Sequence, residues 1–491
     1  MRCLFLLALC FVVSFANSVF AKIPGDDGVA ADQWLVQKLD HFDPSSSRTW
    51  WQKYHTNETW FRNSRKSPVF LLIGGNHRTK AKSVAEGAFV DYARKFGALC
   101  FQIEHRFYGA SLPTDDLTVS NLRFLIVDQA LADIAFFVKQ MNARYKLTSN
   151  NRWVVFGKGY AGSLAAWARL KYSHLIHAAV SSSAPLQAVN GYSGFDENIK
   201  QVLSSSTASC PEQIHQAALN IENLLKTPNG VDILTRKFKR CNSLNPKNDT
   251  EVAFFVESLA RHFRGAVESA LNEPSITSTN HHHTIDEICS LMGDEKFGNA
   301  LDRYAAVHSL FTFGNLFTSG KCKDDNFNDY ISAFRDESNF NVSRIWLYQR
   351  CTEFGFFPIS TSKNSLFGSL IDLKFYVNTC QQIFGDGFDA KRLTDGVART
   401  NMMYGGLDLE SSRIISIVGD MDLWRDLGLQ KSSKRNEQVI VIEGVGSDAD
   451  FNVPSPNDPP QLVNAREIVQ KTIGEWLFNS SCASTSCSNS H

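Results

Sequence analysis

Short apolar runs alternate with segments of helical periodicity over the first part of the chain. Val69–Ile73, Leu99–Glu104 and Trp153–Phe156 are nearly continuous apolar runs of strand length, which is typical of strands buried on both faces of a parallel sheet. Apolar residues recur at helical spacing in Leu125–Met141 and Leu164–Tyr172, which follow two of these runs. The alternation predicts βαβ units and therefore an α/β fold.

A different pattern separates this part of the chain from its C-terminal part. Helical segments, dispersed cysteines and polar connections fill residues 196–385 and predict a mainly helical domain inserted into the α/β domain. Strand-like runs at Ile414–Val418 and Gln438–Ile442 and an amphipathic helix at Ala465–Phe478 then complete the α/β domain. The expected divisions are a leader at 1–21, an α/β domain at 22–195 and 386–480, the insert at 196–385 and a mobile Ser-rich tail at 481–491.

The N-terminus has the three parts of a secretory signal peptide. Arg2 supplies a positive charge, Leu4–Val13 an apolar run and Val19-Phe20-Ala21 a small-residue cleavage pattern. No later run approaches the roughly 20 apolar residues that a transmembrane helix needs. We therefore expect a protein without a membrane span that enters the secretory pathway and is secreted or lysosomal.

Cysteines and glycosylation sequons agree with that route. Of the eleven cysteines, two lie in the leader and Cys100 lies in an apolar run, where we expect a buried thiol. The others form an even set for disulfides whose pairing the sequence does not reveal: Cys210, Cys241, Cys289, Cys322, Cys351, Cys380, Cys482 and Cys487. Sequons that accept glycans in secreted proteins stand at Asn57, Asn248, Asn341 and Asn479.

The overall charge excludes some classes of partner. The 491 residues include 50 Lys and Arg and 50 Asp and Glu, so the formal net charge is zero. With 43% apolar residues, the chain is long enough to bury a sizeable core. The chain therefore has no net positive charge that would attract nucleic acid or an anionic membrane. We expect no nucleic-acid partner.

The segment Gly157-Lys158-Gly159-Tyr160-Ala161-Gly162 ends a predicted strand on glycines and begins a helix. As G-x-G-x-x-G it matches the dinucleotide fingerprint, but that site needs an acidic residue about 20 positions later. Residues 163–195 contain no Asp or Glu, so we expect no nucleotide and no other cofactor. As G-x-S-x-G it is a nucleophile elbow whose serine is replaced by Gly159. An ordinary βα turn without catalytic ancestry fits this segment equally well.

Other sequence blocks decide between these interpretations. The chain carries Leu39–Phe42, Glu104–Gly109, Gln129–Asp133, Ser182–Pro185, Cys351–Gly355, Ile383–Gly385 and Tyr404–Gly406. These blocks, spread over most of residues 38–478, resemble the family of lysosomal prolyl carboxypeptidase, dipeptidyl peptidase II and thymus-specific serine protease. The resemblance implies an α/β-hydrolase fold with a helical insert, exopeptidase activity beside proline or a small residue, and a homodimer.

The resemblance also implies a substrate cleft for a peptide or protein ligand. Gly75 belongs to its oxyanion side, and Tyr160 and Trp424 belong to its walls. Glu353 is expected to face the cleft from the helical insert. There it either binds the amino end of a peptide or stabilises a disulfide-linked helix.

The catalytic triad of the family falls on three positions of this chain. The nucleophile pattern G-x-S-Y-x-G falls on Gly159, the acid pattern N-G-x-x-D-P-W on Asp422, and the base pattern G-x-x-H-x-x-D on Ser447. Only the acid is present. Glycine cannot form an acyl-enzyme, and a serine hydroxyl cannot take and return a proton at pH 7. Our first hypothesis is therefore a non-catalytic relative, a pseudopeptidase, whose cleft binds peptides.

Two alternatives remain open. The second hypothesis is an active serine exopeptidase with a displaced site, with Lys158 or His77 as its base and a nucleophile among Ser163, Ser181–Ser183 and Ser193. His105 is expected to be structural. The third hypothesis is an interaction protein that uses its surface instead of its cleft.

We expect no metal site. The tract His281–His283 is predicted to be a solvated loop, because no further Cys or His follows at ligand spacing. Asp420, Asp422, Asp448 and Asp450 could together attract calcium. We expect instead that Asp420 and Asp448 are surface-loop acids and that Asp450 caps a helix or bonds a loop.

Overall fold

The computed structural model describes residues 31–272, 284–316, 320–323, 326–431 and 437–478. An eight-stranded sheet forms its centre, in the order β1-β2-β4-β3-β5-β6-β7-β8. Of the described strands, only β2 runs opposite to the others. This mixed sheet, covered by helices on both faces, is an α/β-hydrolase fold. Its strands are β1 (Gln33–Lys38), β2 (Thr49–Asn57), β3 (Val69–Ile73), β4 (Leu99–Ile103), β5 (Trp153–Lys158), β6 (Ile176–Ser182), β7 (Ile414–Gly419) and β8 (Glu437–Ile442).

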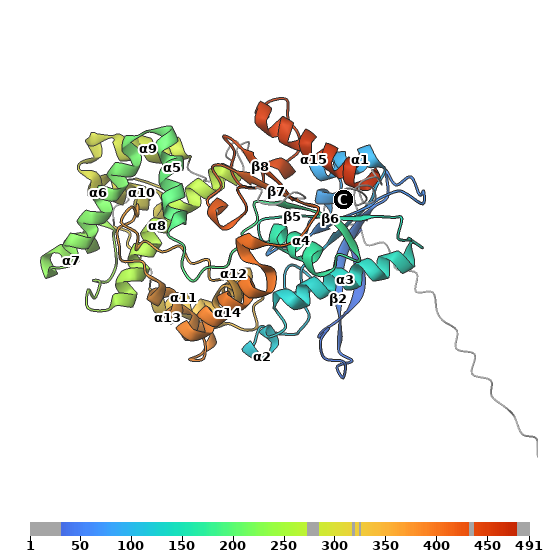
Figure 1. Cartoon of the computed structure of the whole chain (residues 1–491). Coiled ribbons are helices and arrows are strands. Elements are labelled where there is room, and N and C mark those ends of the chain that lie inside the picture. Colours follow the sequence, from blue (N-terminus) through green and yellow to red (C-terminus); the bar gives the residue numbers. More distant parts are fainter. Residues whose placement is uncertain (1–30, 273–283, 317–319, 324–325, 432–436, 479–491) are drawn as a thin grey trace, which may run out of the picture.

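Helices cover both faces of the sheet, which explains the continuous apolar runs. Every residue of β3 is buried, and successive side chains enter opposite cores: Leu71 lies in one and Phe70 in the other. In Figure 1 the helices α1 (Ala88–Phe96) and α15 (Pro460–Phe478) lie on one side of the sheet. On the other side are α3 (Val127–Arg144) and α4 (Tyr160–Lys171).

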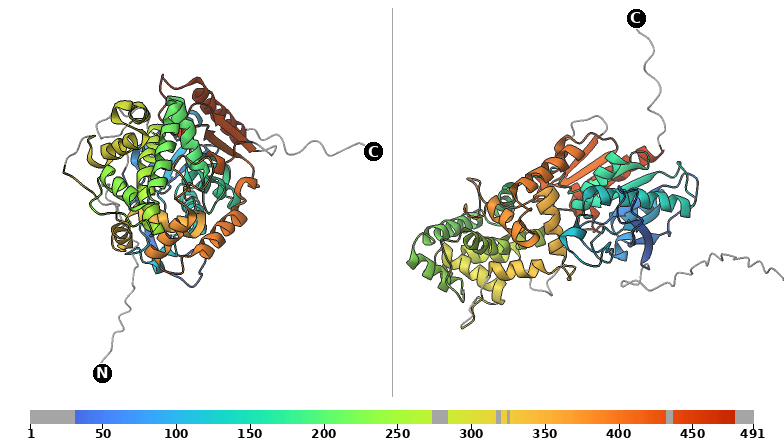
Figure 2. Two further views of the ribbon diagram at one scale, coloured as in Figure 1. Left: turned by 90° about the vertical axis from the view of Figure 1, so that its left-hand side faces the viewer. Right: turned by 90° about the horizontal axis from the view of Figure 1, so that it is seen from below.

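A helical body is inserted in the chain between β6 and β7, which are neighbours in the sheet, and it extends from one end of the sheet (Figure 2). The predicted boundaries at 196 and 385 stay predictions, although α5 already begins at Gly194 and α13 ends at Phe384. The helices between the two strands are α5 (Gly194–Ser206), α6 (Ser209–Leu224), α7 (Pro228–Lys237), α8 (Asp249–Asn272), α9 (Ile285–Gly293), α10 (Ala300–Phe313), α11 (Phe327–Arg335), α12 (Val342–Gln349), α13 (Leu373–Phe384) and α14 (Ala390–Tyr404).

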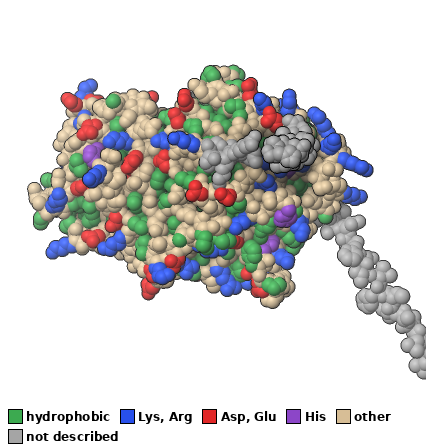
Figure 3. All heavy atoms as spheres, viewed as in Figure 1, with side chains coloured by type: hydrophobic (Ala, Val, Ile, Leu, Met, Phe, Trp, Pro, Cys, Tyr) green, Lys and Arg blue, Asp and Glu red, His purple; other side chains and the backbone are tan. Residues whose placement is uncertain are grey.

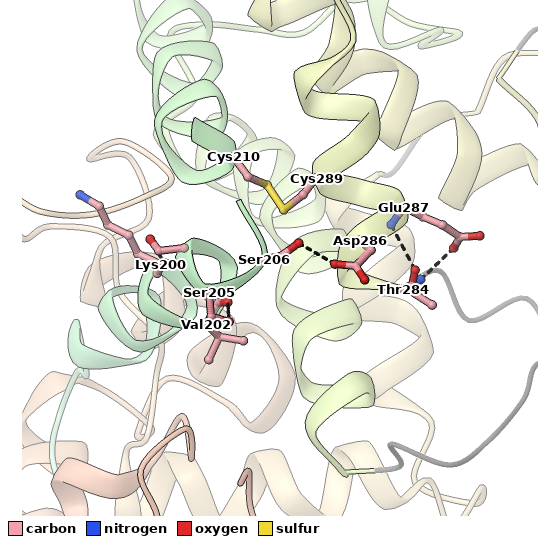
Figure 4. Close-up of a disulfide and its surroundings, with 10 residues drawn as sticks. Lys200, Val202, Ser205, Ser206, Cys210, Thr284, Asp286, Glu287 and Cys289 are labelled. Atoms are coloured by element: carbon pink, nitrogen blue, oxygen red, sulfur yellow. Dashed lines mark hydrogen bonds between the residues drawn. A yellow bond between two sulfur atoms is a disulfide. The ribbon is translucent and has the colours of Figure 1, made fainter. Parts of the chain in front are cut away.

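Three disulfides among the described residues stabilise the helical body, and Figure 4 shows the one that joins α6 to α9. Cys100 is a buried free thiol, as predicted. Because disulfides persist in oxidising compartments, these bonds fit a protein of the secretory pathway. The pairs are Cys210–Cys289, Cys241–Cys322 and Cys351–Cys380.

Several predictions fall outside the described residues: the leader, the tract His281–His283, Asn479, Cys482 and Cys487. Within the part of the chain that the structure describes, no helix has the length and apolar character to cross a membrane. Basic and acidic side chains are interspersed on the face shown in Figure 3, in keeping with the balanced composition.

Candidate functional site

The turn after β5 has the backbone of a nucleophile elbow. Gly159 stands between β5 and α4 with φ +56° and ψ −130°, a conformation that strains residues with a side chain. A Cβ at Gly157 would lie 2.0 Å from the Ala161 carbonyl oxygen, and one at Gly162 would lie 2.6 Å from that of Ser182. A Cβ at Gly159 would meet nothing within 4 Å. The turn therefore requires glycine at its flanks but leaves open space at its centre.

The positions of the acid and the base meet beyond the ends of β7 and β8. Asp422 is only 2% exposed, and its carboxylate accepts a hydrogen bond from the Trp424 N–H at 2.9 Å. Burial raises the pKa of Asp422 to about 6, although the Trp424 N–H and the nearby hydroxyls of Ser447 and Ser183 oppose the shift. Ser447 and Gly159 both line one cavity. The structure thus brings the three triad positions to one end of the sheet.

A second acid lies beside the elbow, where the sequence pointed to a surface loop. Asp448 lines the cavity, and its Oδ1 is buried without a hydrogen-bond partner among the described residues. Its Oδ2 lies 3.5 Å from the Lys158 Nζ. Burial raises the pKa of Asp448, and Lys158, His77 and the Gly159 N–H act in the opposite direction. Asp448 therefore lies in a loop, as predicted, but its side chain is only partly exposed and faces the cavity.

Asp450 was expected to cap a helix or to form hydrogen bonds in a loop, and it does form a hydrogen bond. Its carboxylate accepts a 2.5 Å hydrogen bond from the Ser182 hydroxyl, and burial raises its pKa to about 6. Asp420 accepts a hydrogen bond from the Gly444 N–H at 2.8 Å. Among the described residues, no group of three or more His, Cys, Asp and Glu side chains is arranged to hold a metal ion.

Most serines near the elbow are engaged in structural hydrogen bonds. The Ser163 hydroxyl donates to the Pro185 carbonyl at 2.9 Å, and the Ser181 hydroxyl donates to the Gly162 carbonyl at 2.9 Å. Ser183 differs because it lines the cavity and contacts Asp422. It also has φ +47° and accepts a hydrogen bond from the Asp448 N–H at 2.9 Å. No sequence pattern distinguished Ser183 from its neighbours.

Tyr160 and Trp424 line the cavity as the resemblance implies. The Tyr160 hydroxyl is 3.1 Å from His105 Nε2 and accepts a hydrogen bond from Gln349 at 3.0 Å. Burial lowers the pKa of His105 to about 4, so this ring is neutral and structural, as predicted. The ring of Trp424 lies 4.7 Å from that of Phe195.

Gly75 and Glu353 lie outside the described lining of the cavity. Gly75 packs against the elbow, since a Cβ there would stand 3.4 Å from the Cβ of Ala161. Contrary to the expectation that it faces the cleft, Glu353 is buried and accepts the Val127 N–H at 3.0 Å at the start of α3. Burial raises the pKa of Glu353 to about 8. Glu353 therefore stabilises the start of α3, which is not the disulfide-linked helix of the second predicted role.

The sequons differ in how they are presented. Asn248 is exposed, and Asn341 caps α12 through its Oδ1, which accepts the Ser343 N–H at 2.9 Å. The Nδ2 of Asn57, the atom that would carry a glycan, donates to the Val84 carbonyl at 2.7 Å. Asn57 is therefore the least available of the three described acceptors.

The cavity measures about 570 Å³ and lies between the sheet and the helical body. This volume is in the range of ligand pockets, which measure roughly 300 to 1,000 Å³. Helices α8, α11, α12 and α13 supply much of its wall. Aromatic residues on that side are Phe254, Tyr330, Phe334, Trp346, Phe375 and Tyr376.

Comparison with known proteins gives relatives that match most of the chain. The thymus-specific serine protease of Mus musculus is 31% identical over 471 residues, which cover 92% of this chain and 89% of that protein. The lysosomal Pro-X carboxypeptidase of Bos taurus is 26% identical over 457 residues, which cover 91% of this chain and 87% of that protein.

A solved structure, the proline iminopeptidase of Mycobacterium smegmatis, matches 91% of this chain and 100% of its own, with a sequence identity of 10% and a TM-score of only 0.31. The profile of one family, described as serine carboxypeptidase S28, matches residues 37–469. Since that match spans nearly the whole chain, the chain belongs to the serine carboxypeptidase S28 family.

Proposed function

We propose that this protein is a non-catalytic member of its family that binds peptides in the cavity between the sheet and the helical body. One observation carries the proposal. Gly159, at the centre of the elbow, has the backbone conformation that a nucleophilic residue would have there, and open space surrounds it. It has no side chain. Without a nucleophilic oxygen at this position, no acyl-enzyme can form there.

The base position supports the same conclusion. Ser447 lies beside Asp422, in the place where the family pattern has a histidine that would carry the proton. In the serine protease subtilisin, loss of the triad serine or histidine lowers turnover by about 10⁶. Two such losses leave Asp422 without a group to orient.

The charge of Asp448 also opposes catalysis. Acyl transfer builds negative charge on an oxygen close to the nucleophile, and enzymes place hydrogen-bond donors there. Asp448 instead brings a carboxylate to the edge of the elbow, where the Gly159 N–H is one of the groups that interact with it. In its ionised form this carboxylate repels the oxyanion.

Binding requires only the cavity. About 570 Å³ lined by aromatic side chains accommodates a few amino-acid residues, and the relatives named above act on peptides, as their names indicate. We propose secretion or lysosomal delivery after removal of a signal peptide, with glycans at the sequons and paired subunits.

Labelling with a fluorophosphonate probe tests the loss of catalysis. The purified protein should take up no probe and should leave proline-containing peptides intact, as followed by mass spectrometry. Bovine lysosomal Pro-X carboxypeptidase serves as the positive control. Stoichiometric labelling of any serine would overturn the proposal.

A displaced site is the second candidate, and one observation favours it. Ser183 lines the cavity and lies beside Asp422. If this pair were a nucleophile and its base, the probe would label Ser183, and the Ser183→Ala variant would lose that label. Ser163→Ala is the matched control, because the Ser163 hydroxyl is bonded to a backbone carbonyl.

A further inference from the structure

The backbone leading out of α12 is unusual where it meets the cavity. Arg350–Phe354 forms a π-helical segment, followed by Gly355 with φ +68° and Phe356 with φ +56°. Short π segments and bulky residues at positive φ are rare, and both are often found at functional sites. The Phe356 ring is held 5.5 Å from that of Phe354.

This backbone fixes the Arg350 side chain. The Nε donates to the Gly355 carbonyl at 3.3 Å and Nη2 donates to the Phe356 carbonyl at 2.9 Å. The guanidinium lies over the Phe357 ring at 4.3 Å and 5.9 Å from the Tyr376 ring. Among the described residues Nη1 has no hydrogen-bond partner, and Arg350 lines the cavity. One edge of a fixed guanidinium is therefore available to a ligand.

The other arginines of the cavity have carboxylates nearby. Arg264 forms two 2.9 Å hydrogen bonds to Asp196 and a further one to Glu257. The Arg261 Nη2 lies 4.0 Å from Glu257. Arg350 has no carboxylate within 4.0 Å in the part of the chain described. Removing a charge from water without a partner is costly, so an anion gains from binding beside Arg350.

The remaining acid of this region does not neutralise Arg350. Glu268 lines the cavity but makes no ion pair with a described residue. Burial raises the pKa of Glu268, with Arg264 and Arg350 acting against the shift. Glu268 is therefore not an ion-pair partner of Arg350 in the part of the chain described.

We propose that Arg350 binds one carboxylate of a peptide in this cavity and sets the ligand preference of the protein. The carboxylate belongs either to the C-terminus of the peptide or to an Asp or Glu side chain. The planar guanidinium matches a carboxylate in shape, and one unpaired arginine matches a single negative charge better than a phosphate dianion. The inference rests on the proposed peptide-binding function and adds the chemical class of the ligand.

Calorimetry with three probes tests this inference: acetyl-Ala-Pro-Phe with a free carboxylate, the same peptide as its amide, and acetyl-Glu-Pro-Phe amide. We expect a carboxylate to strengthen binding by roughly 10- to 100-fold over the plain amide. If the free acid gains, the C-terminus is recognised, and if the Glu peptide gains, the side chain is recognised. Equal binding of all three probes to the wild-type protein would overturn the inference.

Variants locate the effect. Arg350→Gln should remove the preference for carboxylate, Arg350→Lys should retain part of it, and Arg94→Gln, on α1 and outside the cavity lining, should leave it unchanged. Circular dichroism checks that each variant folds, and the wild-type comparison of acid and amide needs no variant. A preference that survives in folded Arg350→Gln contradicts the inference.

The same data separate this inference from the proposed function. Peptide binding without a carboxylate preference overturns the role of Arg350 alone. Hydrolysis of a probe overturns the loss of catalysis, and the preference is then measured in KM. Absence of binding by all probes overturns both.

Discussion

The two ends of the cavity differ in their side chains: the sheet end lacks two residues of the catalytic triad, and the helical end carries fixed arginines and aromatic rings. At the sheet end the backbone has the sharp turn of a hydrolase, but positions 159 and 447 lack the side chains for catalysis. At the helical end, Arg264 and Arg350 are held by several hydrogen bonds each, and aromatic rings surround them. In the function that we propose, catalysis is lost at the sheet end, while the helical end supplies the side chains that bind the ligand.

This contrast follows from what each residue contacts. Gly157 and Gly162 are fixed by the backbone around them, so the elbow persists because the fold requires it. The centre of the elbow faces open space. A side chain lost there removes no packing, so catalysis can disappear without any loss of the fold.

The largest effect is expected from restoring the missing triad side chains at the sheet end, which would remove the difference between the two ends. Gly159→Ser alone should stay inactive, because Ser447 cannot act as a base. Gly159→Ser/Ser447→His should gain hydrolysis of proline-containing peptides by about 100-fold or more over the background, since triad residues act as a unit. Fluorophosphonate labelling measures the same gain.

A further substitution sharpens this experiment. Asp448→Asn added to the double variant should raise turnover by another tenfold or so, because it removes a negative charge beside the oxyanion. Asp408→Asn, at an exposed position, is the control. Activity in the single Gly159→Ser variant would reveal that another group in the cavity acts as the base.

The second prediction concerns the flanks of the elbow. Gly157→Ala would force a Cβ to within 2.0 Å of the Ala161 carbonyl oxygen, so we expect a loss of about 3 kcal/mol or more in the free energy of unfolding. Urea titration followed by circular dichroism measures the loss. Gly265→Ala, where a Cβ would meet nothing within 4 Å, is the helical control and should not be destabilised. Near-wild-type stability of Gly157→Ala would contradict the packing argument.

The elements that hydrophobic periodicity located best are the strands with two buried faces. Residues 69–73, 99–104 and 153–156 were predicted as strands and correspond to β3, β4 and β5. The hairpin of β1 and β2 was missed because many of its buried side chains are polar. Gln52 donates to the Glu104 carbonyl at 2.8 Å, and Lys53 forms a 3.3 Å ion pair with Glu104. Such partners are distant in sequence, so no local pattern reveals them.

The site was predictable where it depends on aligned motifs and unpredictable where it depends on loop geometry. Positions 159, 422 and 447 came from the family pattern and meet at one end of the sheet. Asp448 was predicted as a surface-loop acid, but its place in the cavity lining beside Lys158 was not predicted, because that contact is a tertiary property. Arg350 was missed for the same reason: its surroundings depend on a π segment that periodicity does not detect.

The third prediction is a pH dependence of stability that originates at the sheet end. Burial raises the pKa of Asp422 from its ordinary 3.8 to about 6, so the folded chain holds a proton that the unfolded chain releases between these pH values. The stability that this carboxyl contributes is therefore greatest below about pH 4 and falls as the pH rises to about 6.

Comparison with a variant isolates this effect. Relative to wild type, Asp422→Asn should be more stable at pH 7 than at pH 4 by at most about 3 kcal/mol. Asp450 also has a pKa of about 6, but it contributes equally to both proteins and cancels in the difference. Thermal unfolding at intervals between pH 4 and pH 7 measures the slope. A difference that is independent of pH would mean that Asp422 is ionised throughout this range.

The smallest effect on stability is expected at Gly159, the position on which the comparison of the two ends depends most. Gly159→Ala should lower the free energy of unfolding by only about 1 kcal/mol, the cost of holding alanine at φ +56°. No steric term adds to it, because the new Cβ meets no atom within 4 Å. Urea titration beside Gly157→Ala gives the two values under one set of conditions. A loss as large as that of Gly157→Ala would mean that the elbow no longer accepts a side chain, and the inactivity of this site would then reflect a change of backbone as well as a missing serine.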